Sequence, residues 1–201
     1  MWRWHEACRR HGVAAELDHR VFPLELLNER CTPKPTLDAE VPVVGALAPS
    51  FGFRLWSAPA WQWPVSTLPA LEAVQAAKVQ SLAVSTALDL ALRQALFRDS
   101  RCVSMSHVVL DVAEGVDGLD VDALVAELRS GRPRSRIDDD LAVARSDDVQ
   151  GSPHVFVASR SVPNPGITMH WEGKAGEGGF PVVDDDDPSI YDSLVTATSP
   201  G

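Results

Sequence analysis

The stretch Gly151-Ser152-Pro153-His154 places a proline directly before an apolar run that has the composition of a buried strand. Proline has no N–H to donate to a strand ladder, so prolines in sheets lie at strand starts, edges or bulges. One interpretation is a proline that begins a strand after a Gly-Ser turn. The other is a cis proline that presents unpaired backbone to a ligand. Cis bonds occur at only about 5–6% of X–Pro positions, so the second interpretation needs support from elsewhere in the chain.

Other groups of polar residues give weaker signals. Ser152 and His154 flank the proline, but the GxSxG turn of serine hydrolases is absent around them. The glycine-rich run at 173–179 lacks the GK[ST] ending of a phosphate-binding loop and indicates a hairpin. The carboxylates Asp184–Asp187 have no EF-hand spacing, and Asp138–Asp140 fit an exposed helix face. We therefore expect neither hydrolysis nor phosphate or calcium binding.

The three cysteines, Cys8, Cys31 and Cys102, form no CxxC pair. An odd and low count argues against a disulfide framework, and free cysteines are most often small buried hydrophobes. His5, Cys8 and His11 lie in one expected helix, where a rotation of 100° per residue spreads them over about 120° of its surface. Coordination of one metal ion by all three would be strained, so we expect no metal site and no catalytic cysteine.

The composition of the 201 residues limits the classes of partner. The formal net charge is −10, and the sequence pI is about 4.9. This balance disfavours nucleic acids and anionic membranes, whose attraction depends on clustered Lys and Arg. The sequence has no run of about 18 apolar residues, and the first residues, MWRWHEACRRHG, contain no apolar signal segment. We expect a cytoplasmic protein that binds neither nucleic acid nor membrane.

The first third of the chain is predicted to contain one helix and one strand. Residues 2–11 favour a helix that ends at Gly12. Residues 13–22 alternate between apolar and polar side chains, which predicts a half-buried strand. Residues 31–69 carry seven prolines with Trp56, Trp61 and Trp63 among them. Because each proline removes a backbone donor, we expect an irregular but ordered covering segment there.

Residues 66–146 have the apolar spacing of four or five consecutive helices, one of them capped by Asp120. Strands are expected at 154–159 and 167–173, joined by the turn Asn164-Pro165-Gly166. A last helix is expected after Asp187-Pro188. The order predicts a layered α/β domain, residues 1–65 and 147–201, that is split by a helical insertion at 66–146.

This order and several motifs resemble the DsbA-like family of the thioredoxin-like superfamily, in its cytoplasmic actinobacterial form. The matching pieces extend over roughly residues 2–197. They are Trp2-Arg3-Trp4, Arg20-Val21-Phe22-Pro23-Leu24, PALEAVQAAK at 69–78, ALRQALFRDSR at 91–101, and Gly151-Ser152-Pro153. The resemblance implies a thioredoxin-like α/β fold with an inserted all-helical subdomain.

The resemblance also implies a site. Pro153 would be the cis proline of this fold, and Gly151, Ser152 and Pro153 would bind a peptide or thiol through their backbone, by strand addition. Expected partners are proteins or small molecules that contain a disulfide or a thiol. We expect no bound cofactor, although a low-molecular-weight thiol is possible as a co-substrate.

The catalytic half of the family's site has no counterpart in this sequence. Family members carry CxxC at the start of the first helix, where the helix dipole stabilises a thiolate. When Trp2-Arg3-Trp4 is aligned with the first helix of the family, the CxxC falls a few residues before Met1. The family's first strand, an interior strand of the sheet, precedes the CxxC and is missing as well. No catalytic residue is therefore identifiable in this sequence. Either the sequence is short at its N-terminus, which we favour, or another segment or chain fills the gap.

Two functions follow as hypotheses. The first is a DsbA-like thiol–disulfide oxidoreductase whose CxxC is not in this chain. The second is a redox-inactive thioredoxin-like binding module that holds a peptide or thiol beside Pro153. A CxxC encoded upstream of Met1 would support the first hypothesis, and its absence there would support the second.

Overall fold

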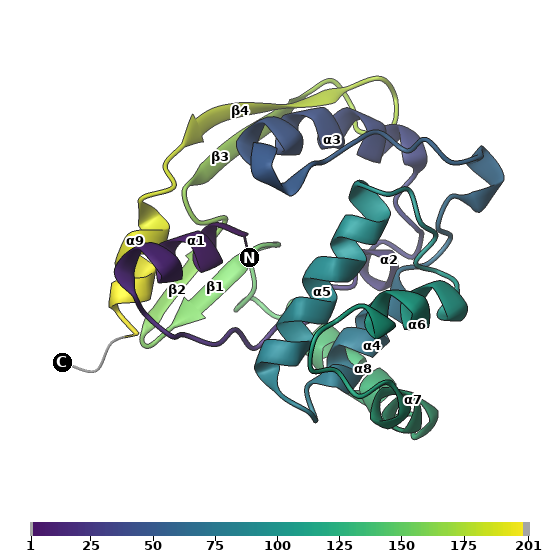
Figure 1. Cartoon of the computed structure of the whole chain (residues 1–201). Helices are drawn as coiled ribbons and strands as arrows, with labels where there is room; N and C mark the ends of the chain where they lie inside the picture. The colour runs from purple at the N-terminus through teal and green to yellow at the C-terminus, as the bar shows by residue number, and fades with distance from the viewer. Residues whose placement is uncertain (1, 199–201) are drawn as a thin grey trace.

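The computed structural model describes residues 2–198 and has a helical block beside a smaller α/β part (Figure 1). Within the described residues there are nine α-helices and two antiparallel two-stranded sheets. The fold class is therefore mixed α and β. No helix among residues 2–198 has the length and apolar character needed to cross a membrane.

Five consecutive helices form the helical block, as predicted. They are α4 (Leu68–Ala77), α5 (Leu82–Phe97), α6 (Ser106–Glu114), α7 (Val121–Arg129) and α8 (Arg132–Ala144). Leu88 and Leu92 of α5 lie one helical turn apart and are both buried in the core of the block. Asp120 caps α7 by accepting a hydrogen bond from Ala123 N–H at 2.9 Å, which confirms the predicted cap.

The α/β part consists of α1 (Trp2–His11), the hairpin β1–β2 and α9 (Ile190–Thr196). Strand β1 (His154–Val157) pairs antiparallel with β2 (Arg160–Pro163). One face of the hairpin packs against α1 and α9 in a core of its own. The buried members of this core are Trp4, Ala7, Cys8, Val157, Tyr191, Leu194 and Val195. We refer to it as the α1–α9 core.

Strands are present within 154–159 and 167–173, as predicted, but the prediction that the turn at 164–166 joins them into one hairpin is wrong. The chain reverses at Ala158, where φ is +51°, and β1 pairs with β2 instead. Strand β3 (Ile167–Glu172) forms a second hairpin with β4 (Phe180–Asp186), closed by the glycine-rich run. Gly166 lies between the two hairpins with φ +71°, and a Cβ at this position would lie 2.0 Å from the Asp187 carbonyl oxygen. Only glycine fits this close approach.

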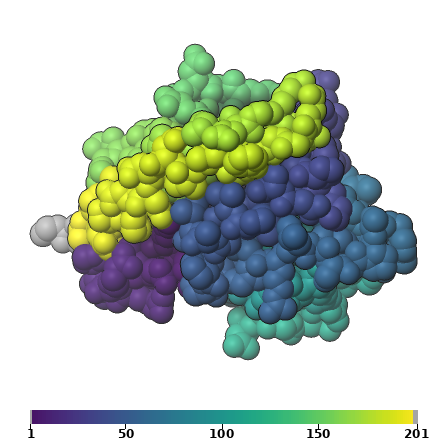
Figure 2. All heavy atoms as spheres, turned by 90° about the horizontal axis from the view of Figure 1, so that it is seen from above, coloured from purple at the N-terminus to yellow at the C-terminus, as the bar shows by residue number. Residues whose placement is uncertain are grey.

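The proline-rich region contains more regular structure than predicted. A 14-residue helix, α3 (Lys34–Leu47), lies inside it and packs along β4, as Figure 2 shows. Pro35 occupies the first turn of α3, where a missing N–H is tolerated, but Pro42 lies within the helix. Shorter pieces precede and follow α3: α2 (Leu24–Leu27), η1 (Pro49–Phe51) and η2 (Ala60–Gln62).

The predicted strand at 13–22 is extended but is not part of a sheet. Val13, Ala15 and Leu17 are partly buried against the α1–α9 core, whereas Glu16 and Asp18 are exposed, so the predicted alternation is present. Within the described residues, however, no strand pairs with it. The prediction had the right side-chain periodicity but assumed a neighbouring strand.

Candidate functional site

The turn at Gly151-Ser152-Pro153 joins the end of the helical block to β1. The Ser152–Pro153 peptide bond is cis, which confirms the prediction for Pro153. Ser152 and Pro153 are exposed. The Pro153 carbonyl accepts a hydrogen bond from Asn164 N–H at 2.8 Å, which holds the turn against the end of β2. Among residues 2–198, neither Gly151 nor Ser152 makes a hydrogen bond, so their backbone groups are available to a ligand.

His154 follows the turn and has a defined tautomer. Its Nδ1 accepts the backbone N–H of Gln150 at 3.1 Å, so the proton of the neutral ring lies on Nε2. Nε2 therefore donates to Ser161 Oγ, 2.9 Å away. A histidine that donates to a serine cannot take that serine's proton. His154 and Ser161 thus do not form the base–nucleophile pair of a serine hydrolase.

Two extended stretches have an edge with no strand partner among residues 2–198. One is the extended segment that runs from the end of α1 to the helical block (Figure 1). Within residues 2–198, the backbone groups of residues 14–20 make no hydrogen bond with other backbone groups. The other is the edge of β1 that faces away from β2, since β2 is the strand that pairs with β1. In the segment, the His19 carbonyl accepts from the Gln75 and Lys78 side chains, so this edge is unpaired only in the sense that no strand bonds to it.

The segment and β1 contribute side chains to the same core. Val13, Ala15 and Leu17 from the segment, and Val155 and Val157 from β1, all belong to or pack against the α1–α9 core. An open hollow of about 490 Å³ lies between α1 and the start of the segment. The two edges without strand partners therefore both border the α1–α9 core.

The far end of the segment is tied to the helical block. Lys78 of α4 forms an ion pair with Asp18 and also donates to the His19 carbonyl. Burial opposes ionisation of Asp18, but the Lys78 ammonium outweighs it and lowers the pKa of that carboxyl group. Gln75 Nε2 donates to the same His19 carbonyl at 3.0 Å. These contacts hold the segment extended without a sheet.

Asp140 of α8 completes this attachment, and the prediction that it lies on an exposed helix face is wrong. Its side chain is buried, whereas Asp138 and Asp139 are exposed. Its carboxylate accepts hydrogen bonds from Val21 N–H and from Arg20. Sequence analysis missed Asp140 because its partners are more than a hundred residues away in the chain.

None of the three cysteines is in a disulfide. Burial raises the pKa of the Cys8 thiol. Cys31 is exposed, and desolvation together with the neighbouring Glu25 carboxylate raises its pKa. A raised pKa lowers the thiolate fraction, and the thiolate is the nucleophile. Cys8 and Cys31 therefore lack the environment of redox-active thiols.

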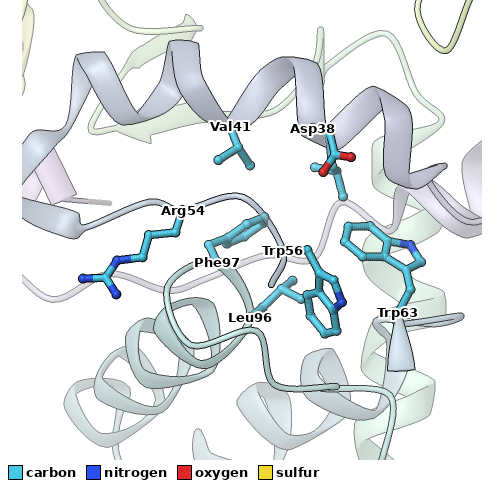
Figure 3. Close-up of a pocket in the computed structure, with 8 residues that line it drawn as sticks. Asp38, Val41, Arg54, Trp56, Trp63, Leu96 and Phe97 are labelled. Carbon is cyan, nitrogen blue, oxygen red and sulfur yellow. The ribbon is translucent and has the colours of Figure 1, made fainter. Parts of the chain in front are cut away.

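A narrow crevice between α3 and the end of α5 is lined by aromatic side chains (Figure 3). Trp56 and Trp63 meet there edge to face, with ring centroids 5.2 Å apart. The free volume in the crevice is about 10 Å³. This is close to what a single water requires. The tryptophans therefore pack the covering segment onto the helices and do not form a ligand pocket.

The aspartates that precede α9, Asp184–Asp187, make hydrogen bonds and an ion pair within the protein. Asp186 forms an ion pair with Arg3, Asp184 accepts from His170 at 2.9 Å, and Asp187 accepts from Ser189 N–H at 3.0 Å. Within residues 2–198, no three His, Cys, Asp or Glu side chains gather as ligands for a metal ion.

Comparison with known proteins gives no assignment: no family model, no curated protein and no solved structure matches this chain.

Proposed function

We propose that this chain is a thioredoxin-like domain of the DsbA-like type, which serves a thiol–disulfide oxidoreductase whose CxxC is not in this chain. The order of elements supports the proposal. A first helix, an extended segment, a helical insertion, a cis-proline turn, a hairpin and a final helix follow one another, and α1 and α9 share one face of the hairpin. This is the order that the sequence resemblance implies.

The observation that carries the proposal is the pair of edges without a strand partner, one of which belongs to β1, directly after the exposed Ser152–Pro153 turn. Residues 14–20 and β1 border the same α1–α9 core. Within residues 2–198, no strand bonds to residues 14–20, and none bonds to the edge of β1 that faces away from β2. One extended strand between them would satisfy both sets of backbone groups. We propose that such a strand binds there and carries the redox cysteines to the turn.

The chemistry would be thiol–disulfide exchange. A cysteine thiolate attacks one sulfur of the substrate disulfide, which forms a mixed disulfide and releases the other substrate sulfur as a thiolate. The second cysteine then attacks the mixed disulfide. The substrate leaves reduced, and the cysteine pair is oxidised. A low-molecular-weight thiol could return the pair to its reduced form by the same exchange. The backbone of Gly151 and of the exposed Ser152 would bind the substrate as an extended peptide.

A second candidate function is a redox-inactive binding module. It is favoured by the protonated state expected for the Cys8 and Cys31 thiols and by the absence of a cysteine pair in the sequence. In this version, the strand between the two edges belongs to a bound peptide and the turn at Pro153 contacts it, but no sulfur chemistry takes place.

The deciding experiment uses the gene. The coding sequence upstream of Met1 is read in frame, and a protein extended to the next upstream start is assayed for reduction of insulin disulfides. The matched control carries serine in place of both cysteines of any CxxC found there. Activity that disappears in the control supports the oxidoreductase. If no CxxC is encoded, or if the extended protein is inactive, the oxidoreductase proposal fails and the binding module replaces it.

A further inference from the structure

Strand β3 has one edge to which no other strand among residues 2–198 bonds. It pairs with β4 on one side, and the sheet has no third strand within the described residues. Apart from this pairing, the backbone groups of residues 168–172 make no hydrogen bond with another described backbone group. Four of these five residues are exposed: Thr168, Met169, His170 and Glu172. The edge is therefore open to a partner from outside the chain.

Strand β3 also lacks the features that usually protect an exposed edge. Edge strands commonly carry Lys or Pro, or a bulge that twists them away from other chains. Residues 167–172 contain neither Lys nor Pro. The hairpin has one bulge, but the extra residue is Asp184 of β4, so β3 itself stays regular. An unprotected edge of this kind is a template onto which an extended peptide adds as a further strand.

The charge of the hairpin selects the kind of peptide. Residues 167–187 carry six carboxylates and one lysine, in a chain whose formal net charge is −10. Asp184 is bonded to His170 and Asp186 to Arg3, whereas Glu172 and Asp185 make no ion pair with a described residue. Two copies of β3 side by side would bring like charges together, which destabilises a sheet. The same carboxylates attract Lys and Arg, so the charge favours a basic peptide over a second copy of the chain.

The two faces of β3 define where the side chains of such a peptide lie. Glu172 is opposite Phe180 of β4, which is 49% exposed, and both point to one face of the hairpin. Met169 is opposite Val183 and belongs to the other face, where it is 43% exposed. Side chains of a strand alternate between faces. A strand added to β3 therefore places cationic side chains beside Glu172 and apolar side chains beside Met169, at alternate positions.

We propose that the open edge of β3 binds an extended basic segment of a partner protein, in which Lys or Arg alternates with apolar residues. The segment adds as a third strand to the β3–β4 hairpin. This inference goes beyond the proposed function, because the edge of β3 includes neither the turn at Pro153 nor residues 14–20. The thiol–disulfide chemistry and the binding at β3 therefore stand or fail separately.

The test uses the whole chain and the acetylated, amidated peptide KVKVKVK as the probe. Two matched peptides accompany it. EVEVEVE reverses the charge, and KVKVKVK with N-methyl groups at its five inner residues keeps the charge but cannot donate hydrogen bonds there. Dissociation constants are measured for the unchanged protein, for Glu172→Lys and for Glu114→Lys. Glu114 is exposed at the end of α6, so its variant makes the same change of charge far from β3 in the sequence.

We expect KVKVKVK to bind and the two matched peptides not to bind. Glu172→Lys should weaken binding about three- to tenfold, because an attraction beside β3 is replaced by a repulsion. Glu114→Lys should leave binding unchanged. In the unchanged protein, those amides of residues 168–172 that face away from β4 should exchange more slowly when KVKVKVK is added. This last measurement needs no variant, so the test stands even if Glu172→Lys folds poorly.

Four results would overturn the inference. Equal binding of the N-methylated peptide would show attraction between charges without an added strand. Equal weakening by Glu172→Lys and Glu114→Lys would show that the overall charge attracts the peptide. No binding at millimolar concentration would leave the edge without a basic partner. Protection of residues 168–172 that grows with protein concentration, without peptide, would assign the edge to a second copy of the chain. None of these results bears on the reduction of insulin.

Discussion

The Asp140 carboxylate on α8 accepts the backbone N–H of Val21 at 2.8 Å and the Arg20 guanidinium at 3.0 Å. Asp140 is 4% exposed, so this is a buried carboxylate held by two donors from one distant segment. The contact fixes the point where the extended segment leaves the α/β part and meets the helical block. It thereby helps to hold residues 14–20 straight in the absence of a strand partner.

Replacing Asp140 with Ala is expected to lower the free energy of unfolding by about 2–4 kcal/mol, because Val21 N–H loses its acceptor in a buried position and Arg20 loses its charge partner. Urea unfolding followed by circular dichroism measures the change. The matched control is Asp139→Ala, one position earlier on the exposed face, which is expected to change stability by less than about 0.5 kcal/mol. Equal effects of the two substitutions would contradict the role given to Asp140.

Amide hydrogen exchange is expected to distinguish the extended segment from the helices. The amides of Glu16 and Leu17 have no hydrogen-bond acceptor among residues 2–198, so they are expected to exchange rapidly. The amides of Leu88 and Leu92 lie inside α5 and are buried, so they are expected to exchange slowly. Exchange of Leu17 as slow as that of Leu88 would show that the segment has a strand partner in solution, such as a second copy of the chain.

Substitution of Gly166 is expected to disrupt the connection between the two hairpins. Gly166→Ala forces a residue with a Cβ to φ +71° and against the Asp187 carbonyl, so we expect a loss of more than about 2 kcal/mol in unfolding free energy. Gly118→Ala is the control. Gly118 has a similar φ of +78°, but no atom lies within 4 Å of its added Cβ. We expect about 1 kcal/mol there. The prediction fails if both variants melt at the same denaturant concentration.

The stability of the protein is expected to decrease as the pH falls from 7 toward 5, partly because of His19. Burial lowers the pKa of His19 below its ordinary value, so the folded state favours the neutral ring. The unfolded chain then binds a proton at a higher pH than the folded chain. The stabilisation from the neutral ring is full above the unfolded pKa and is lost as the pH falls toward the folded one.

Unfolding free energies measured across this pH range, with and without His19→Gln, check the prediction. Glutamine keeps a polar group near Thr86, whose Oγ1 lies 3.2 Å from His19 Nε2, but it does not titrate. The pH dependence should become flatter in His19→Gln. His107→Gln, on the exposed surface of α6, is the control for a histidine-to-glutamine change away from residue 19. An unchanged slope in His19→Gln would contradict the assignment.

The helices outside the proline-rich region were predicted well, whereas the pairing of the strands was not. The apolar stripe through Leu88 and Leu92, the cap at Asp120 and the end of α1 at Gly12 are all recognisable from a few neighbouring residues. Helix hydrogen bonds join residues four apart, so local sequence is enough to specify them. Pro42 is an exception, since a proline at that position predicts an interruption that packing against β4 overrides in α3.

Of the candidate site, the cis bond at Ser152–Pro153 agrees with the prediction made from the family resemblance. The binding role of Gly151, Ser152 and Pro153 stays a prediction. The surroundings of this turn were not predicted. The Gln150 N–H that sets the His154 tautomer leaves no signal in a single sequence, because the contact depends on which atoms lie nearby in the folded chain.

The sequence by itself therefore determined where the helices outside the proline-rich region lie, the alternation of residues 13–17 and the position of the proline turn, because periodicity and turn chemistry are local properties of the chain. Only the tertiary structure decided that β1 pairs with β2, that Asp140 is buried against Val21, and that residues 14–20 lack a strand partner. Each of these depends on contacts between residues far apart in sequence, where chain topology and the packing of the two cores select the partner.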